Sequence, residues 1–346
     1  MKIFKTIWNG ITWLFTMWLK YRSMDPGLRA ANGVFWAGTL GAGGTGFCLK
    51  ADLKLPVLSS VTASWGDQAP LWMSISLMAV GIVCFILRIK HCEKKWLTAL
   101  VYVRGLSRMA EAPPKDDLPS KYTLGRVIPF SYPIIDRATP EERLDELKQI
   151  ERDLKHRISS EEQSPRHVLF AGLGDVPLLY AAGCLLGTRK GLEVMDYDRN
   201  VLKWSTLDEC DNGKRIEIVK PKELKEDLAI VIPFTIPIND EQIPEHLRGC
   251  IARVEPQWNI KTDAVLCERQ LAEITAAIND YIRDVRRKIE RVHLFLATGA
   301  SSAFKLGMYY QENAYPETFV YQYDSKTNQY VWAVRVDKGR QEIVQG

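Results

Sequence analysis

Two short turns rich in glycine and serine carry the clearest potential for chemistry in this sequence. Each follows an apolar run and precedes a segment with helical periodicity; the small residues are Gly172 and Gly174 in the first turn, and Gly299, Ser301 and Ser302 in the second. The start of a helix presents unpaired N–H groups and a partial positive charge, and small residues let an anion approach the backbone. Both turns therefore predict sites for phosphate groups.

The two turns belong to an internal repeat. Residues 167–207 and 293–333 align without a gap, and each has the order strand, turn, helix, strand, turn. Only five positions are identical, so the similarity lies in the order of periods and breakers. A strand–helix–strand unit with a parallel crossover brings its strand ends and its helix start to one edge of the sheet, where ligands bind. Two such units predict one pocket with two phosphate-binding ends, suited to a nearly symmetric ligand.

The sequence lacks the common enzyme signatures. It contains no G-x-x-x-x-G-K-[ST], no H-E-x-x-H and no G-x-S-x-G, and its five histidines are scattered. Gly172 and Gly174, with Asp196 and Asp198 downstream, partly match a dinucleotide fingerprint. However, Pro177 replaces the third glycine and the second repeat does not keep the pattern. A nicotinamide-dependent membrane enzyme is therefore a minor alternative, and we expect no enzymatic activity and no cofactor.

Bulk composition narrows the choice of partners. At 346 residues the chain is long enough for two or three domains. The net charge of +4 is small and the basic residues are spread along the chain, so we expect no binding to DNA or long RNA. The seven cysteines are unclustered, which indicates reduced thiols and no metal site.

The first ninety residues differ in kind, because they contain two uncharged runs of 20 residues, between Arg29 and Lys50 and between Asp67 and Arg88. Twenty helical residues rise about 30 Å, the thickness of a bilayer core. We predict transmembrane helices over 30–49 and 68–89. Gly38, Ala42 and Gly46 have the spacing that lets membrane helices approach closely. Basic residues flank the pair on both outer sides, so both termini are predicted in the cytoplasm.

The flanking segments complete the predicted domain order. Residues 1–22 have a polar stripe opposite an apolar stripe that contains tryptophan, which predicts an amphipathic helix at the membrane interface. Residues 90–121 are predicted to be a juxtamembrane helix, from Trp96 to Met109, followed by a proline-containing linker. A soluble domain is expected over 122–340, with one unit at about 122–240 and the other at about 263–340.

The sequences of the two repeats are similar to a known family. The run from His293 to Asp324, followed by Tyr330, Val331 and Trp332, resembles the end of a SAVED domain, and residues 167–198 resemble its first half. The resemblance implies an α/β fold of two fused CARF-like Rossmann units that senses cyclic oligonucleotides in bacterial anti-phage signalling (CBASS). With two membrane helices in front, the chain resembles the transmembrane SAVED effectors.

The resemblance implies a cyclic di- or trinucleotide as ligand, made by a cognate nucleotidyltransferase. For the phosphates we expect the turns Gly172, Leu173, Gly174, Asp175 and Thr298, Gly299, Ser301, Ser302, with Lys305 one helical turn further. For the bases, which stack on aromatic rings with about 1–3 kcal/mol each, we expect Tyr197, Trp204, Phe234, Phe304 and Tyr323. Asp198 and Asp324 are further candidates, although carboxylates at such positions more often cap turns.

Two hypotheses of different class follow. In the first, the protein is a multi-pass protein of the bacterial inner membrane that binds the nucleotide, forms homo-oligomers and disrupts the lipid bilayer, which causes abortive infection. In the second, it is a membrane-tethered nuclease that degrades the same nucleotide. No base is paired with a nucleophile locally in the sequence, which favours the first hypothesis.

Overall fold

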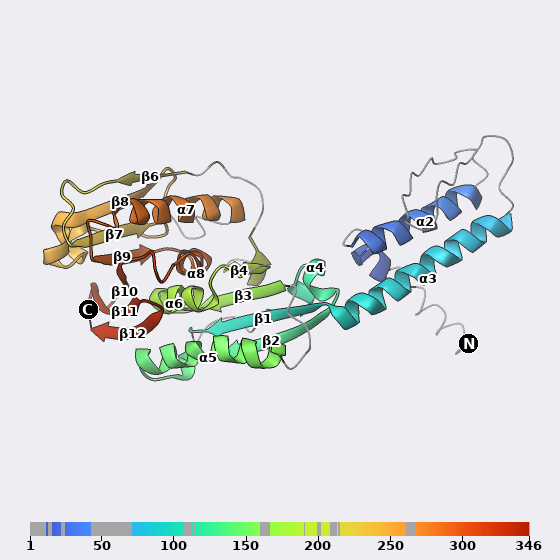
Figure 1. The fold of residues 1–346 in the computed structure, drawn as a ribbon, viewed down its shortest axis with the longest axis horizontal. Coiled ribbons are helices and arrows are strands. Elements are labelled where there is room, and N and C mark those ends of the chain that lie inside the picture. The colour runs from blue at the N-terminus through green and yellow to red at the C-terminus, as the bar shows by residue number, and fades with distance from the viewer. Residues whose placement is uncertain are drawn as a thin grey trace. The chain divides into compact units, whose positions relative to one another are not determined.

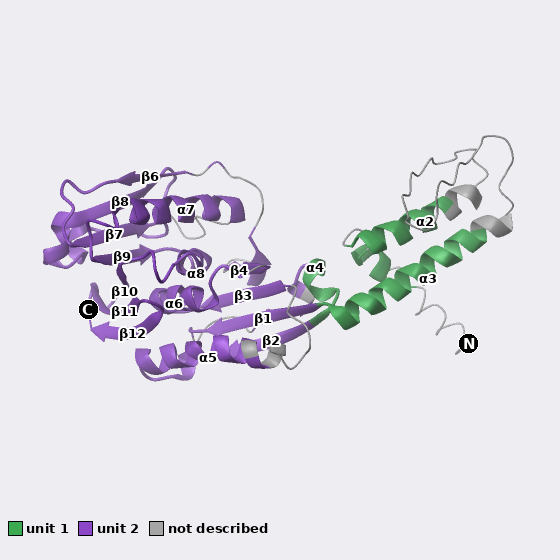
Figure 2. Ribbon diagram, in the orientation of Figure 1, with its two compact units in different colours: residues 1–96, 120–126 green, residues 97–119, 127–346 purple. Residues whose placement is uncertain are grey.

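The computed structural model describes residues 12, 16–21, 25–42, 71–106, 112–113, 115–159, 167–189, 191–198, 202–207, 213, 215–260 and 267–345. The chain divides into two compact units (Figures 1 and 2). Unit 1 comprises residues 1–96 and 120–126, and unit 2 comprises residues 97–119 and 127–346. The predicted interfacial helix and the loop before residue 71 lie largely outside the described residues.

The described part of unit 1 consists of two long helices and one short helix. Its helices are α2 (Pro26–Ala42), α3 (Leu71–Lys95) and the short α4 (Ser120–Thr123). A buried cluster that includes Tyr21, Leu28 and Phe85 joins them. Asp25 forms a two-pronged ion pair with Arg88, with nitrogen–oxygen distances of 2.7 and 3.1 Å, and this pair ties the start of α2 to α3.

Within the described residues, the close approach of the two long helices depends on Gly81. A Cβ atom there would lie 2.8 Å from the backbone nitrogen of Phe35, so a larger residue would push α2 and α3 apart. Of the three residues predicted to serve this purpose, Gly38 and Ala42 lie in α2, and Gly46 lies outside the described residues.

One helix of unit 1 is suited to a bilayer. In the described part of the chain, only the segment from Ile75 to Lys95 of α3 is long and apolar enough to cross a membrane, by length and composition. Its large apolar side chains Ile75, Val80, Val83 and Leu87 are exposed. The α2 helix has 17 residues and covers only part of the predicted span 30–49, so a second span stays a prediction.

Unit 2 contains two mixed β-sheets with helices between and around them (Figure 1). The first has the order β2-β1-β3-β4-β5 and the second β12-β11-β10-β9-β7-β8-β6. The strands are β1 (Leu97–Arg104), β2 (Arg126–Tyr132), β3 (His167–Leu173), β4 (Leu192–Asp198), β5 (Lys203–Thr206), β6 (Ile216–Val219), β7 (Asp227–Pro233), β8 (Ile251–Pro256), β9 (Arg291–Ala297), β10 (Glu317–Asp324), β11 (Gln329–Asp337) and β12 (Arg340–Gln345). The helices are α5 (Pro140–Ser159), α6 (Val176–Leu186), α7 (Glu268–Val285) and α8 (Ala300–Met308), with short 3₁₀ helices at η1 (Lys115–Asp117), η2 (Ile134–Asp136), η3 (Asp240–Gln242) and η4 (Glu245–Cys250).

Each sheet contains one predicted strand–helix–strand unit. The β3 and β4 strands are parallel neighbours joined by α6, and β9 and β10 are parallel neighbours joined by α8. The strand order reverses once in each sheet, between β1 and β3 and between β7 and β9. Ligands of open α/β sheets bind beyond the carboxyl ends of the strands at such reversal points. The fold therefore provides two equivalent positions for a site.

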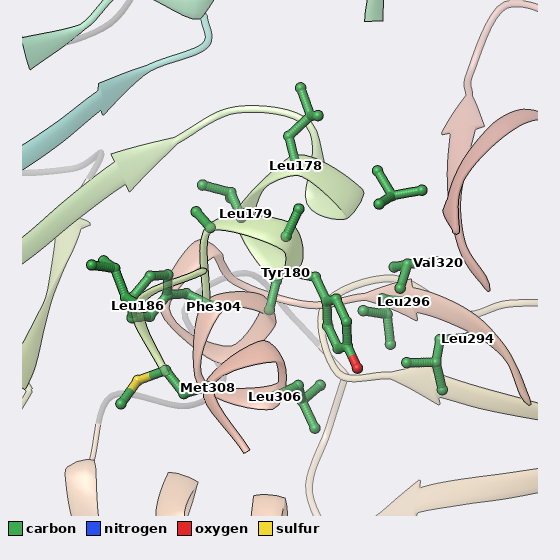
Figure 3. Close-up of a cluster of buried hydrophobic side chains, with 14 of the residues drawn as sticks. Leu178, Leu179, Tyr180, Leu186, Leu294, Leu296, Phe304, Leu306, Met308 and Val320 are labelled. Atoms are coloured by element: carbon green, nitrogen blue, oxygen red, sulfur yellow. The ribbon is translucent and has the colours of Figure 1, made fainter. Parts of the chain in front are cut away.

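The two sheets are joined through α6 and α8, which cross at glycines. A Cβ atom at Gly183 would lie 2.1 Å from the carbonyl oxygen of Phe304, and one at Gly307 would lie 2.0 Å from that of Tyr180. The contacts are reciprocal: Phe304 of α8 stacks on Phe170 of β3, whereas Tyr180 of α6 lies among Leu294, Leu296 and Val320 of the other sheet (Figure 3). Each helix thus completes the core of the opposite half.

One predicted element is wrong. Residues 97–104 form strand β1, not part of a juxtamembrane helix, and the strand pairs in parallel with β3. Seven of its eight residues are buried. A strand buried on both faces has no alternation of polar and apolar residues, so its short apolar run cannot be told from a helix by periodicity.

Helix α5 is an amphipathic helix of 20 residues. Its start follows a capping box, because Thr139 Oγ1 accepts a hydrogen bond from the Glu142 amide while the Glu142 carboxylate accepts one from the amide of Thr139. The apolar side chains Leu144, Leu147, Ile150 and Leu154 recur at intervals of three or four residues and are buried in the core.

Candidate functional site

A pocket of about 240 Å³ opens at the strand reversal of the second sheet. It lies at the carboxyl ends of β7, β9 and β10, and the first residue of α6 also lines it. The residues that line it include Val176, Thr235, Thr298, Gln322, Tyr323 and Tyr330. The amides of Phe234 and Thr235 both donate to the carbonyl oxygen of Ala297, at 2.8 and 2.9 Å, which holds the ends of β7 and β9 together. This volume can hold one base, whereas drug-sized ligands occupy roughly 300–1,000 Å³.

Two buried polar atoms at this pocket have no hydrogen-bond partner. They are Thr298 Oγ1 and Gln322 Oε1, and the Thr298 residue is only 9% exposed. Most buried polar atoms in folded proteins are satisfied, so each such orphan needs an explanation. The neighbouring phenol and amide are engaged: Gln242 Nε2 donates to Tyr323 and Asn328, and Tyr323 donates to Asn328.

The start of α8 beside the pocket already holds an anion. Ser301 Oγ in the first turn donates to Asp196 Oδ2 at 2.9 Å, and the same oxygen lies 4.0 Å from the position of a Cβ atom on Gly299. A carboxylate at a helix start is stabilised by the partial positive charge there. The site that the sequence predicts for a phosphate is therefore occupied by a carboxylate of strand β4.

The equivalent position in the first sheet is filled. The Gly105 amide donates to the carbonyl oxygen of Leu173 at 2.6 Å, and a Cβ atom on Gly105 would lie 2.5 Å from the Cα atom of Gly174. The side chain of Ile134 lies within 3.2 Å of the same point. Asp175, at the start of α6, is paired with Arg143 at 2.8 Å. The two units thus share the same order of strands and helix, but they differ in how closely the residues at the strand reversal are packed.

Comparison with known proteins places this geometry in a family. A sequence profile described as "SMODS-associated and fused to various effectors sensor domain", SAVED, matches residues 147–336, which is more than half of the chain. The chain belongs to the SAVED family. Strand β1 precedes the matched region, although it lies inside the same sheet as β3. No curated protein sequence matches the chain significantly.

Comparison with solved structures gives matches to SAVED/CARF-domain receptors. The Cap4 receptor of Acinetobacter baumannii with the cyclic trinucleotide 3'3'3'-cAAA has 12% identity and a TM-score of 0.47, covering 77% of this chain and 59% of the receptor. The same receptor with 2'3'3'-cAAA has 10% identity, a TM-score of 0.45 and coverages of 75% and 55%. Cap4 of Moraxella osloensis has 12% identity, a TM-score of 0.43 and coverages of 80% and 59%. The chain therefore spans less than two thirds of each receptor, and likeness at this level says nothing about individual residues.

Several residues expected to contact the nucleotide belong to the core of the SAVED domain. Phe304 and Phe234 are fully buried, against Phe170 and Trp258, and Trp204 is buried between Tyr102 and Tyr197. These three rings already contact other rings in the core, so a base can stack on one of them only after a neighbouring ring has moved. Tyr197 is half-buried, and only Tyr323 of the expected aromatic residues lines the pocket.

The charged candidates are also held by other residues. Lys305 is 5% exposed and is paired with Glu268 of α7. Asp324 caps the turn between β10 and β11, where it accepts hydrogen bonds from Lys326 and Thr327. Gly172, Leu173 and Ser302 lie in the interior, and Asp198 is half-buried at the end of β4. Among the expected site residues, Thr298 and Tyr323 line the pocket, and Gly299 and Ser301 stand beside it at the start of α8.

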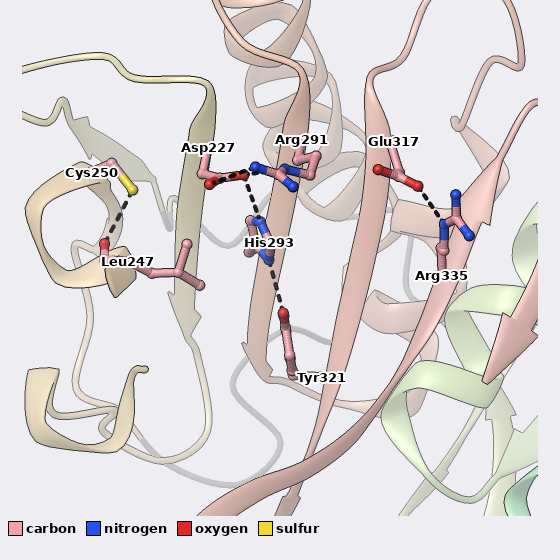
Figure 4. Close-up of polar contacts among 8 residues, drawn as sticks. All are labelled: Asp227, Leu247, Cys250, Arg291, His293, Glu317, Tyr321 and Arg335. Carbon is pink, nitrogen blue, oxygen red and sulfur yellow. Dashed lines mark hydrogen bonds and ion pairs between the residues drawn. The ribbon is translucent and has the colours of Figure 1, made fainter. Parts of the chain in front are cut away.

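A polar chain crosses the second sheet next to the pocket (Figure 4). His293 Nδ1 is 2.9 Å from the hydroxyl oxygen of Tyr321, and its Nε2 is 3.2 Å from Asp227 Oδ1. Burial lowers the pKa of His293 and raises the pKa of Tyr321 to about 12. Burial also opposes ionisation of Asp227, but hydrogen bonds from Arg291 and His293 outweigh it and lower its pKa. Asp227, His293 and Tyr321 lie on the neighbouring strands β7, β9 and β10. Their hydrogen bonds therefore join these three strands.

A larger hollow lies at the opposite end of the second sheet. Its volume is about 490 Å³, and it is lined by Glu290, Glu312, Glu317, Asp337 and Lys338, among others. Four carboxylates against one ammonium group would repel an anionic ligand. Size alone would favour this hollow, but charge and its position away from the carboxyl ends of the strands favour the smaller pocket.

Sequence reasoning missed Gln322, Tyr330 and Gln242 as residues of the pocket. Gln322 stands next to the expected Tyr323 and is a polar residue in an apolar strand, which was an available signal. Gln242 could not be found in this way, because it is 81 residues from the tyrosine that it contacts.

Proposed function

We propose that this protein is a membrane-anchored, non-enzymatic receptor that binds a cyclic di- or trinucleotide through its SAVED domain. The observation that carries the proposal is the pocket at the strand reversal of the second sheet, with aromatic walls and two unsatisfied polar oxygens. A family described as a sensor domain supports a ligand-binding role. The ligand would be supplied by a nucleotidyltransferase of the same CBASS system.

The size of the pocket suggests how the ligand is divided. A space of about 240 Å³ takes one base and leaves the ring of sugars and phosphates outside. One phosphate would then lie near the start of α8, where Asp196 is now bound to Ser301. The ligand would therefore have to displace, or tolerate, a carboxylate at this position.

The membrane part of the proposal rests on α3. Its exposed apolar residues Ile75, Val80, Val83 and Leu87 suit contact with lipid better than contact with water. Ligand-bound receptors that form homo-oligomers would raise the local concentration of these helices in the bacterial inner membrane. We infer that the assembled helices disrupt this membrane and cause abortive infection, with both termini in the cytoplasm.

A binding panel tests the proposed function. Full-length protein in detergent is titrated calorimetrically with cyclic di- and trinucleotides, and the ligand is recovered afterwards. We expect saturable binding of at least one member and recovery of the intact cyclic form. Failure of every member to bind would overturn the proposal, and conversion to a linear product would favour the nuclease hypothesis.

A matched pair of variants locates the binding. Val176→Phe narrows the pocket and should weaken binding at least tenfold, because Val176 forms part of its wall. Val219→Phe makes the same change at an exposed position on β6 and should bind as the unaltered protein does. Equal binding by both variants would place the ligand elsewhere.

A further inference from the structure

We infer that the pocket selects a nucleobase with an exocyclic amino group, which it reads through Gln322 and Thr298. The inference rests on the proposed function, since it specifies which part of the cyclic nucleotide enters this pocket and what chemistry it must present. Cytosine, adenine and guanine carry such a group, whereas uracil and hypoxanthine do not.

Two of the polar side chains that line the pocket have an oxygen without a hydrogen-bond partner. Gln322 Nε2 donates to the carbonyl oxygen of Tyr323 at 3.1 Å, which sets the amide orientation and leaves Oε1 as the group without a partner. The second orphan is Thr298 Oγ1. The Gln242 amide is used at both ends, because its Oε1 accepts from the Asn239 amide and its Nε2 donates to Tyr323 and Asn328.

These two oxygens differ in the hydrogen bonds that they can form. An amide oxygen is an acceptor only, so Gln322 Oε1 needs an N–H or O–H donor, whereas a threonine hydroxyl can donate or accept. A buried acceptor without a donor is unfavourable. An amino group beside a ring nitrogen satisfies both orphans at once: the amino N–H donates to Gln322 Oε1, and the Thr298 hydroxyl donates to the ring nitrogen.

Aromatic side chains form part of the pocket wall. Tyr321, Tyr323 and Tyr330 contribute to the wall, with the rings of Tyr323 and Tyr330 5.5 Å apart. Aromatic walls suit a flat base and tolerate any of the bases by stacking alone. Selection must therefore come from the polar pair. Both oxygens are covered in this structure, so a base edge reaches them when neighbouring side chains move aside, and the entering base replaces an unsatisfied arrangement with a satisfied one.

Exchange of the amino group for a carbonyl reverses the pattern. In hypoxanthine the oxygen that replaces the adenine amino group would face Gln322 Oε1, which places two acceptors together. The experiment therefore compares matched cyclic oligonucleotides that differ only at this position: cyclic di- and tri-AMP against cyclic di- and tri-IMP, with cyclic di-UMP as a natural base without the group. Titration calorimetry on full-length protein in detergent measures each affinity. We expect every inosine or uridine ligand to bind at least about tenfold more weakly than the best amino-bearing ligand.

Two variants assign the preference to these side chains. Gln322→Met and Thr298→Val remove the polar atoms with little change in volume, and each should reduce the ratio between the paired ligands toward one. Thr318→Val makes the same change outside the pocket on β10, where the hydroxyl bonds to Pro316, and should keep the ratio. A thermal-unfolding midpoint for each variant shows whether it is folded; if Gln322→Met is unfolded, the ratio measured for Thr298→Val decides.

The outcomes separate this inference from the proposed function. Equal affinity for the AMP and IMP ligands, or tightest binding of cyclic di-UMP, would overturn the inference about base selection. The proposed function as a cyclic-nucleotide receptor would still hold. A strong AMP preference that both pocket variants retain would also overturn it, because the discrimination would then come from other residues. Absence of binding by every ligand would overturn the function and the inference together.

Discussion

At the scale of residues, the most informative contact is between Asp196 and Ser301. The two residues are 105 positions apart, yet they meet at the start of α8, where the helix dipole favours an anion. The sequence shows both the helix start and the carboxylate, but it does not show that they are in contact. A phosphate that approaches this position would be repelled by the Asp196 carboxylate and attracted by the partial positive charge at the start of α8.

Replacement of Asp196 tests which effect dominates. Asp196→Asn keeps an acceptor for Ser301 and removes the negative charge, so we expect about tenfold tighter binding of whichever cyclic nucleotide the panel identifies. Calorimetric titration at two salt concentrations measures the change. Asp280→Asn, an exposed change on α7, serves as control and should have no effect. Weaker binding by Asp196→Asn would instead mean that the carboxylate contacts the ligand directly.

At the scale of elements, strand β1 sets the boundary of the sensor domain. The strand lies between β2 and β3 in the first sheet, although it precedes the region that matches the SAVED profile. Its buried Leu97, Leu100, Val101 and Val103 contribute ~6–12 kcal/mol by burial. A domain of ordinary stability has about 5–15 kcal/mol in total. A shortened protein that omits this strand would therefore lose most of its free energy of unfolding.

Two truncations test the role of β1. We expect residues 97–346 to unfold cooperatively on heating, followed by circular dichroism, and residues 120–346 to show no cooperative transition. Both lack the apolar α3 helix, so solubility alone does not separate them. If the shorter protein unfolds cooperatively at the same midpoint as the longer one, β1 does not stabilise the sheet.

At the scale of the whole molecule, the chain combines a nearly symmetric sensor with an apolar helix in the other unit. Each sheet carries the same strand–helix–strand unit. Within the described residues, the pocket lies at the strand reversal of the second sheet, whereas Gly105, Gly174 and the Ile134 side chain pack closely at the equivalent place in the first. Under the proposed function, each chain contributes this pocket and one α3 helix. Damage by clustering would then depend on how many chains a cyclic ligand brings together.

A single charge tests the membrane assignment of α3. Val83→Lys places a lysine near the centre of the segment from Ile75 to Lys95, which costs about 2.5–3.5 kcal/mol in a bilayer. We expect this variant to be extracted from membranes by alkaline carbonate, whereas the unaltered protein is retained. Glu93→Lys introduces the same residue near the end of the helix and should be retained. Retention of both variants would argue against a span at this position.

The sequence by itself determined the features that depend on neighbours along the chain. The repeat and the apolar helix α3 each follow from local periods and breakers, and they appear in the structure at nearly the predicted residues. Local signals suffice here because backbone dihedrals and the faces of an amphipathic segment are set within a few residues. They failed for β1, where burial on both faces removed the period.

Only the tertiary structure decided which residues form the site. Phe304, Phe234 and Trp204 stand near the right strand ends in sequence, but the crossing of α6 and α8 and the packing of the strands turned their rings into the core. Gln242 and Asp196 reached the second sheet from distant segments. Which of the two equivalent strand reversals stays open depends on the close approach of the backbones at Gly105 and Gly174 and on the position of the Ile134 side chain. This packing exists only once the strands have come together in the sheet.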